Sequence, residues 1–140
     1  MTQEEKQLLL KDLSARLPYG VKISRVVEDY ISEPRIPRTI NIDGCIVIEN
    51  EPFNDGIPDV DYWYICEVKP YLRPMSSMTE DEMEEWNSYV AVPDGKSLRR
   101  TPYCIKYIDW LLEHHFDYRR LIEKGLALEA PEGMYNIKTE

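Results

Sequence analysis

"TINIDGCIVIE", residues 39–49, is the stretch of sequence that decides the fold. Two apolar runs rich in β-branched residues flank the dipeptide Asp43-Gly44, which suits the positive φ angles of a type I′ hairpin turn. A two-residue turn at this position pairs Ile40 with Val47 across the hairpin. The stretch therefore predicts two antiparallel strands joined by a tight turn.

The second strand of this hairpin is apolar on both faces, because Ile46 and Ile48 point away from the face that carries Val47. Such a strand is typical of the middle of a sheet. "VKISRVV" (21–27) and the aromatic-rich "DYWYICEV" (61–68) predict one further strand before the hairpin and one after it. Because turns and loops rather than helices join these strands, we predict an antiparallel sheet of about four strands in the first half of the chain.

Helices flank the predicted sheet in the sequence, and two of them begin with a capping box. Thr2 precedes Glu5 by three residues, and Thr79 precedes Glu82 by the same spacing. At this spacing each side chain accepts a hydrogen bond from the backbone N–H of the other residue. Apolar residues at helical spacing follow both boxes, so we expect an amphipathic helix after each.

Two more helices are predicted nearer the C-terminus. Thr101 and Pro102 supply a cap and a first-turn proline for a third helix. Asp117 is the expected cap of a short fourth helix, which Gly125 ends as a left-handed residue. The pattern predicts an α+β fold in which the N-terminal helix and about three C-terminal helices pack against the sheet. We find no long linker and expect a single domain over residues 1–140.

The chain is acidic, with 26 Asp and Glu against 17 Lys and Arg and a formal net charge of −9. Affinity for nucleic acid depends on basic side chains that neutralise phosphates, so we expect no direct nucleic-acid binding. Ten Tyr and three Trp stand against two Phe. Tyr and Trp combine an apolar body with a polar tip and are common at contact surfaces, so the composition favours a protein partner.

Cys45, Cys66 and Cys104 are odd in number and widely spaced, without the C-x-x-C pairs of zinc or redox motifs. Free thiols of this kind fit a reducing compartment. The N-terminus lacks the layout of a signal peptide, and no apolar run is long enough to span a membrane. The sequence thus predicts a cytoplasmic protein with no membrane association, no metal and no cofactor.

Both histidines, His114 and His115, lie side by side near the end of the predicted third helix. Adjacent helical residues point about 100° apart, so the two rings do not face one metal ion. The i, i+4 spacing of helical zinc sites is also absent. We interpret the pair as structural, near a helix C-terminus where a positive charge is favourable, with a metal ligand or a general base as the alternative.

The stretch "KPYLRPMSSMTEDE" (69–82) carries the remaining candidates. Its prolines hold Tyr71 and Arg73 in an extended path, and helix capping requires neither side chain. The two serines that follow lack the G-x-S-x-G context of a hydrolase nucleophile. We therefore predict no catalytic residue and a binding site drawn from six residues: Tyr71, Arg73, Ser76, Ser77, His114 and His115.

Three blocks of the sequence resemble the shared segments of a known family. They are "MTQEEKQLLLKDLSARLPYGVK" (1–22), "KPYLRPMSSMTEDE" (69–82) and "HHFDYRRLIEKGLALEAPEGMY" (114–135), and together they cover about two-fifths of the chain. The family comprises short, uncharacterised proteins of gut anaerobic bacteria and their prophages. The resemblance implies a phage or mobile-element origin, but no activity, cofactor or functional residue.

Three functions agree with these observations. The first is a non-catalytic interaction or ligand-binding module that acts through a Tyr-rich surface. The second is a small enzyme of unfamiliar type with a histidine-containing cleft, and the third is an acidic inhibitor that mimics nucleic acid. Exposed Tyr rings on one face favour the first, a pocket with a histidine favours the second, and carboxylates along one elongated face favour the third.

Overall fold

The computed structural model describes residues 1–50, 59–90 and 102–135, with the backbone alone for residues 89–90 and 102–107. The fold is α+β, as predicted. In chain order the elements are α1 (Gln3–Arg16), η1 (Leu17–Tyr19), β1 (Ile23–Val27), β2 (Tyr30–Ile31), β3 (Thr39–Ile40), β4 (Cys45–Asn50), β5 (Asp59–Tyr64), η2 (Ile65–Glu67), β6 (Val68–Leu72), η3 (Met75–Ser77), α2 (Glu80–Val90), α3 (Pro102–Glu113) and β7 (Leu128–Glu129), where η marks a short 3₁₀ helix.

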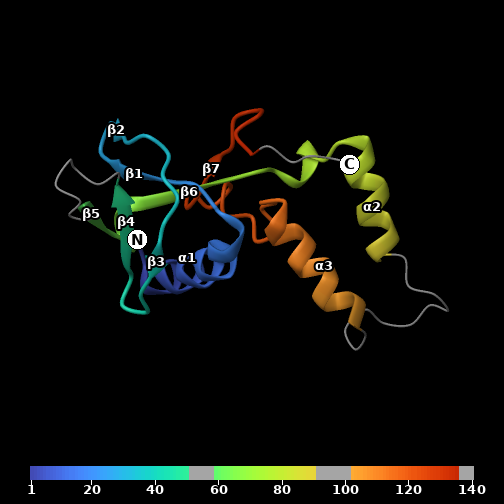
Figure 1. The fold of residues 1–140 in the computed structure, drawn as a ribbon, viewed down its shortest axis with the longest axis horizontal. Helices are drawn as coiled ribbons and strands as arrows, with labels where there is room; N and C mark the ends of the chain where they lie inside the picture. Colours follow the sequence, from blue (N-terminus) through green and yellow to red (C-terminus); the bar gives the residue numbers. More distant parts are fainter. Residues whose placement is uncertain (51–58, 91–101, 136–140) are drawn as a thin grey trace.

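The strands of the described residues form two sheets rather than the single antiparallel sheet that we predicted (Figure 1). One is four-stranded in the order β2-β1-β6-β7, with β6 and β7 parallel, and the other is antiparallel in the order β3-β4-β5. The predicted strand 61–68 is in fact the end of β5, then η2, then the start of β6. The chain therefore passes from one sheet to the other at η2, where the buried Ile65 donates its N–H to the carbonyl of Gly44.

The predicted hairpin is present as β3 and β4, with β4 central in its sheet, but its register differs from the prediction by one residue. Ile40 lies opposite Ile46, not opposite Val47. The turn is also longer, because Asn41 N–H donates to the Cys45 carbonyl at 2.9 Å. A one-residue shift moves a side chain to the other face of a sheet, and this register puts Ile40 on the buried face beside Ile46.

Both predicted capping boxes are confirmed. The Glu5 N–H donates to Thr2 Oγ1 at 3.1 Å, and the Thr2 N–H donates to Glu5 Oε1 at 2.9 Å. In the second box, the Glu82 N–H donates to Thr79 Oγ1 at 3.1 Å, and the Thr79 N–H donates to Glu82 Oε1 at 3.0 Å. Local hydrogen bonds over three residues therefore determine where α1 and α2 begin.

The third predicted helix is also present, since α3 begins at Pro102; its expected cap, Thr101, lies outside the described residues. The predicted fourth helix is wrong, because residues 117–125 form turns. Arg120 adopts a left-handed φ of 59°, which a helix does not tolerate. Gly125 does have the predicted left-handed φ, at 73°, and ends these turns instead.

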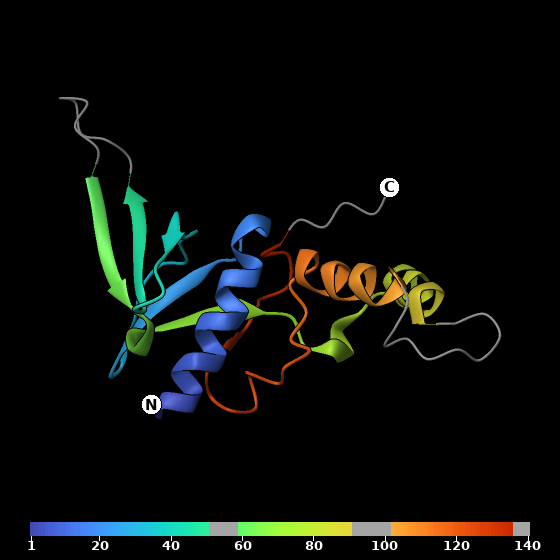
Figure 2. The same cartoon turned by 90° about the horizontal axis from the view of Figure 1, so that it is seen from below.

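The main core lies between α1 and the two sheets. α2 and α3 lie side by side at the opposite end of the molecule from β4 and β5 (Figures 1 and 2), so these helices do not pack against the sheet as predicted. A second, smaller cluster of Trp110, Leu111 and Phe116 forms where α3 meets the segment before α2. The buried side chains of the main core are Leu9, Leu13, Val21, Ile23, Ile46, Ile48, Trp63, Ile65, Val68, Leu72, Leu121, Leu126 and Ala127.

Candidate functional site

Arg73, one of the predicted binding residues, sits immediately after β6 and forms a two-pronged ion pair with Glu82. Its Nη1 lies 2.8 Å from Glu82 Oε2 and its Nη2 lies 2.6 Å from Oε1. The guanidinium also lies 4.3 Å from the centroid of the Phe116 ring. Burial alone raises the pKa of the Glu82 carboxyl, but the hydrogen bonds from Arg73 and Thr79 outweigh it and hold that pKa below its usual value. Glu82 therefore caps α2 and anchors Arg73 at once.

A cleft of about 560 Å³ opens beside this ion pair. One wall comes from residues 73–82, which lead from β6 into the first turn of α2, and the other from residues 129–135, from the end of β7 onward. Of the predicted residues, Arg73 and Ser77 line this cleft, whereas Ser76 is exposed and is not part of the lining. The lining residues are Arg73, Pro74, Ser77, Thr79, Asp81, Glu82, Glu129, Ala130, Pro131, Glu132, Gly133 and Tyr135.

His115 lies behind one lining residue of the cleft, Tyr135. The two rings are stacked, with centroids 3.7 Å apart and planes inclined by 16°. His115 is the second residue after the end of α3, with a left-handed φ of 62°. Its N–H donates to the Leu112 carbonyl and the Phe116 N–H donates to the Leu111 carbonyl, the pattern of a Schellman motif. A histidine thus occupies a position where glycine is usual, and the residue is buried, at 5% exposure.

The surroundings of His115 disfavour its charged form. Burial lowers its pKa to about 4, and the nearby Arg16 and Arg73 guanidinium groups add to the effect. Its Nδ1 atom has no hydrogen-bond partner among the described residues. His115 is therefore neutral near pH 7 and serves as a flat surface against which Tyr135 packs.

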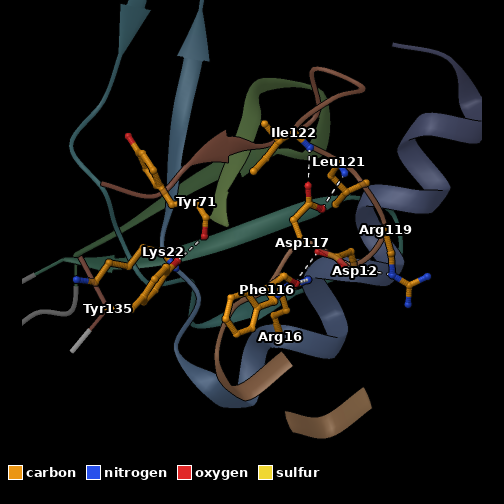
Figure 3. Close-up of polar contacts among 10 residues, drawn as sticks. All are labelled: Asp12, Arg16, Lys22, Tyr71, Phe116, Asp117, Arg119, Leu121, Ile122 and Tyr135. Atoms are coloured by element: carbon orange, nitrogen blue, oxygen red, sulfur yellow. Dashed lines mark hydrogen bonds and ion pairs between the residues drawn. The ribbon is translucent and has the colours of Figure 1, made fainter. Parts of the chain in front are cut away.

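Tyr135 binds the C-terminal segment to Lys22, just before β1, and to Tyr71 of β6 (Figure 3). The Tyr135 hydroxyl donates to the Tyr71 carbonyl at 2.7 Å and accepts from the Lys22 N–H at 2.9 Å. Burial raises the pKa of Tyr135 to about 12, so the hydroxyl keeps its proton. The Tyr71 hydroxyl lies 2.9 Å from Ser24 Oγ. Tyr71 thus supports the segment that forms one wall of the cleft.

His114 points to a different part of the molecule from its neighbour. Its Nδ1 lies 2.8 Å from the Trp110 carbonyl oxygen, and its ring lies 4.3 Å from the Trp110 ring. The structure therefore brings four of the six predicted residues to the region of the cleft, Tyr71, Arg73, Ser77 and His115, and leaves Ser76 and His114 outside it.

A buried charge network that we did not predict joins α1 to the segment after α3 (Figure 3). Arg16 Nε donates to Asp12 Oδ2 at 2.7 Å, and both side chains are fully buried. Arg16 Nη2 donates to the Phe116 carbonyl at 2.6 Å, and Arg119 Nε donates to Asp12 Oδ1 at 3.2 Å. Asp12 and Arg16 fall at helical spacing within the leucine stripe of α1, which is the signal in the sequence that could have revealed them.

The outer face of the β3-β4-β5 sheet carries exposed aromatic rings. Tyr62 and Tyr64 are 60% and 55% exposed, whereas Trp63, which points to the opposite face, is 8% exposed. Val47 lies opposite Tyr62, and Cys45 lies opposite Tyr64. We call this surface, made of Cys45, Val47, Val60, Tyr62 and Tyr64, the tyrosine face.

Comparison with family models, curated proteins and solved structures gives no match to this chain. Among the residues that the structure describes, no helix combines the length and the apolar character needed to cross a membrane. Within the same ranges, no three His, Cys, Asp or Glu side chains gather closely enough to hold a metal ion.

Proposed function

We propose that this protein is a non-catalytic binding module that recognises another protein through the tyrosine face. The observation that carries the proposal is the exposure of Tyr62 and Tyr64, at 60% and 55%, on a sheet whose other face is buried in the core. Tyrosine combines a large contact area with little conformational freedom to lose, and it is enriched where proteins bind one another.

The support beneath the tyrosine face suits a binding surface. Ile46, Ile48 and Trp63 anchor β4 and β5 to the core from the inner face. The exposed rings therefore stand on a rigid sheet, so a partner meets a surface that needs little ordering on binding. Half-buried Val47 and Val60 lie on the same face as the rings, with Val47 directly opposite Tyr62, and extend the apolar area.

The cleft beside Arg73 supports the enzyme alternative less well. Its described lining includes no histidine, because His115 lies behind the Tyr135 ring. A pKa of about 4 makes His115 a weak base near neutral pH, and Arg73 is already engaged by Glu82. A nucleic-acid mimic is also less well supported, since described carboxylates are dispersed over separate elements, such as the start of α1, the start of α2 and the start of β5.

The test uses the double variant Tyr62→Ala, Tyr64→Ala. Tagged wild-type and variant proteins are used to isolate partners from the native host, and each partner is then purified and titrated against both. We expect the double variant to bind at least about tenfold more weakly, because Tyr is enriched among interface hot spots, whose truncation costs about 2 kcal/mol or more. Its free energy of unfolding should change by less than about 0.5 kcal/mol, because both rings are exposed.

Tyr30→Ala is the matched control, because Tyr30 is 63% exposed but belongs to β2 in the other sheet. It should leave the affinity unchanged. If the purified partner binds the double variant as tightly as the wild type, the tyrosine face is not the contact surface and the proposal is wrong.

A further inference from the structure

The backbone of β5 offers an unpaired edge beside the tyrosine face. β5 is the outer strand of its sheet, and Figure 2 shows it with β4 on one side and no other described strand on the opposite side. The hydrogen bond from the Ile65 N–H to the Gly44 carbonyl sets the phase of the β4-β5 ladder. Since hydrogen-bonded pairs alternate along an antiparallel ladder, Trp63 and Asp61 direct their backbone groups toward β4.

The alternate residues Val60, Tyr62 and Tyr64 consequently direct their N–H and C=O groups away from β4. Their side chains belong to the tyrosine face, so the same three residues present both the open backbone edge and the exposed rings. Within the described residues no backbone hydrogen bond reaches this edge. An extended segment placed along it completes the ladder and covers the rings at the same time.

We propose that the partner adds an extended, basic segment to the sheet as a further strand along β5. This inference rests on the proposed function and names the partner's chemistry. β5 is the longest edge strand in the described residues: the opposite edge of its sheet, β3, and both edges of the other sheet, β2 and β7, have two residues each, against six in β5. It also contains no proline, lysine or arginine, the residues that usually protect an edge from pairing.

Charge selects a basic segment. β4 and β5 carry three carboxylates and no Lys or Arg, and one of the three, Glu49, forms an ion pair with Arg38. Two of these, Asp59 and Asp61, lie on β5 on the side opposite the tyrosine face, and both accept hydrogen bonds from the Asn50 amide, at 3.3 and 3.0 Å. Neither forms an ion pair within the described ranges.

Because side chains alternate between the two faces of a strand, the two faces of β5 specify which side chains the partner strand carries. Side chains of the added strand that neighbour Asp59 and Asp61 are Lys or Arg, and those between them are apolar and cover Tyr62 and Tyr64. A second copy of this chain fits poorly, because pairing β5 with β5 brings two acidic segments together.

The test uses a fluorescent peptide of four Lys-Val repeats as the probe and measures its affinity by fluorescence polarisation. Wild-type protein should bind this probe at least about tenfold more tightly than a peptide of four Glu-Val repeats, and added salt should weaken the binding. Equal affinity for the two peptides, or binding to neither, overturns the basic partner. Self-association of the wild type that competes with the probe overturns it in favour of a second copy.

Val60→Pro tests the backbone edge without touching either ring. Proline removes the outward N–H of residue 60 and leaves the ladder to β4 intact, whereas Val60→Ala keeps the N–H. We expect at least about a tenfold loss of probe affinity for Val60→Pro and less than about a threefold loss for Val60→Ala. If both variants bind as the wild type does, strand addition is wrong.

Hydrogen exchange gives a second measurement that does not depend on a stable proline variant. On addition of the Lys-Val probe to the wild type, the amides of Tyr62 and Tyr64 should exchange at least about tenfold more slowly, because their N–H groups become bonded. Unchanged exchange of these amides with bound probe overturns the inference. Loss of partner binding in the Tyr62, Tyr64 double variant, together with full binding by Val60→Pro, overturns strand addition while leaving the proposed function intact.

Discussion

Two ion pairs help to hold separate segments of this chain together, and the two pairs differ in their exposure to water. Asp12 and Arg16 are fully buried and hold α1 against residues 116–119. Glu82 and Arg73, with side chains 3% and 14% exposed, hold the start of α2 against the end of β6. The first pair loses nearly all of its hydration on folding and the second retains part of it, so removal of one partner should be more costly in the first.

The largest effect is expected from Asp12→Ala. The change leaves the Arg16 guanidinium buried without its carboxylate, which typically costs about 3–5 kcal/mol in the free energy of unfolding. Urea unfolding followed by circular dichroism measures the loss.

The double variant Asp12→Leu, Arg16→Met tests whether the charge itself is needed. Replacing both partners by apolar groups of similar volume removes the uncompensated charge, so this variant should be more stable than Asp12→Ala. A double variant as unstable as Asp12→Ala would mean that the contacts to Phe116 and Arg119, rather than the uncompensated charge, carry the effect.

An intermediate effect on the free energy of unfolding is expected from pH, through His115, which lies near the arginines of both ion pairs. His115 has a pKa of about 4 in the folded protein and 6.5 as its ordinary value, with burial the main cause and Arg16 and Arg73 adding to it. Between these values the unfolded chain binds a proton that the folded protein does not, so stability falls as the pH falls from 6.5 toward 4. The difference between these two pKa values limits the loss in the free energy of unfolding to about 3 kcal/mol.

Urea unfolding at a series of pH values between 7 and 5 measures this slope. His115→Asn is the suitable variant, because asparagine tolerates a left-handed φ and does not titrate. The variant should show a flatter dependence in this range. A slope equal to that of the wild type would assign the effect to other groups.

The smallest of the three effects is expected from Arg73→Ala. It removes two charge-assisted hydrogen bonds to Glu82 and the contact with the Phe116 ring, at a cost of about 1–2 kcal/mol at pH 7. Because the pKa of Glu82 is lowered on folding, this contribution is present above about pH 4.5 and is lost as the pH falls through the folded value.

Thermal unfolding of Arg73→Ala and Arg73→Lys at pH 7 and at pH 3 checks this prediction. Lysine keeps the charge but not the two-pronged geometry, so its loss should lie between wild type and alanine. A loss for Arg73→Ala as large as that for Asp12→Ala would show that the difference in burial between the two ion pairs does not determine the cost of breaking them.

For the β3-β4-β5 sheet, the sequence predicted the central strand but not the register of its hairpin. The apolar pattern of residues 45–50 correctly indicated a central strand. It did not reveal the register of the hairpin, because Asp43-Gly44 alone fits a two-residue turn. In the folded protein a Cβ atom at Gly44 would lie 2.8 Å from Ile65 Cγ2, so the turn is shaped by a residue about twenty positions away. The same residue marks the point where the predicted strand 61–68 leaves its sheet.

The candidate binding surfaces were also predictable only in part. Residues 69–82 suggested a contact site because capping left Tyr71 and Arg73 without a role, and the structure places both near the cleft. The excess of tyrosine suggested a contact surface, but not which rings would be exposed. Tyr62 and Tyr64 are adjacent to Trp63 in a strand, and only the packing of Trp63 into the core decides that their rings face outward.

The sequence by itself determined the features that depend on residues within about five positions of one another: the two capping boxes, the start of α3 at Pro102 and the left-handed Gly125. Tertiary structure alone decided the division into two sheets, the buried Asp12–Arg16 pair and the open edge of β5. Local hydrogen bonds are specified by neighbouring residues, whereas a buried charge or a free strand edge depends on which distant segment lies beside it.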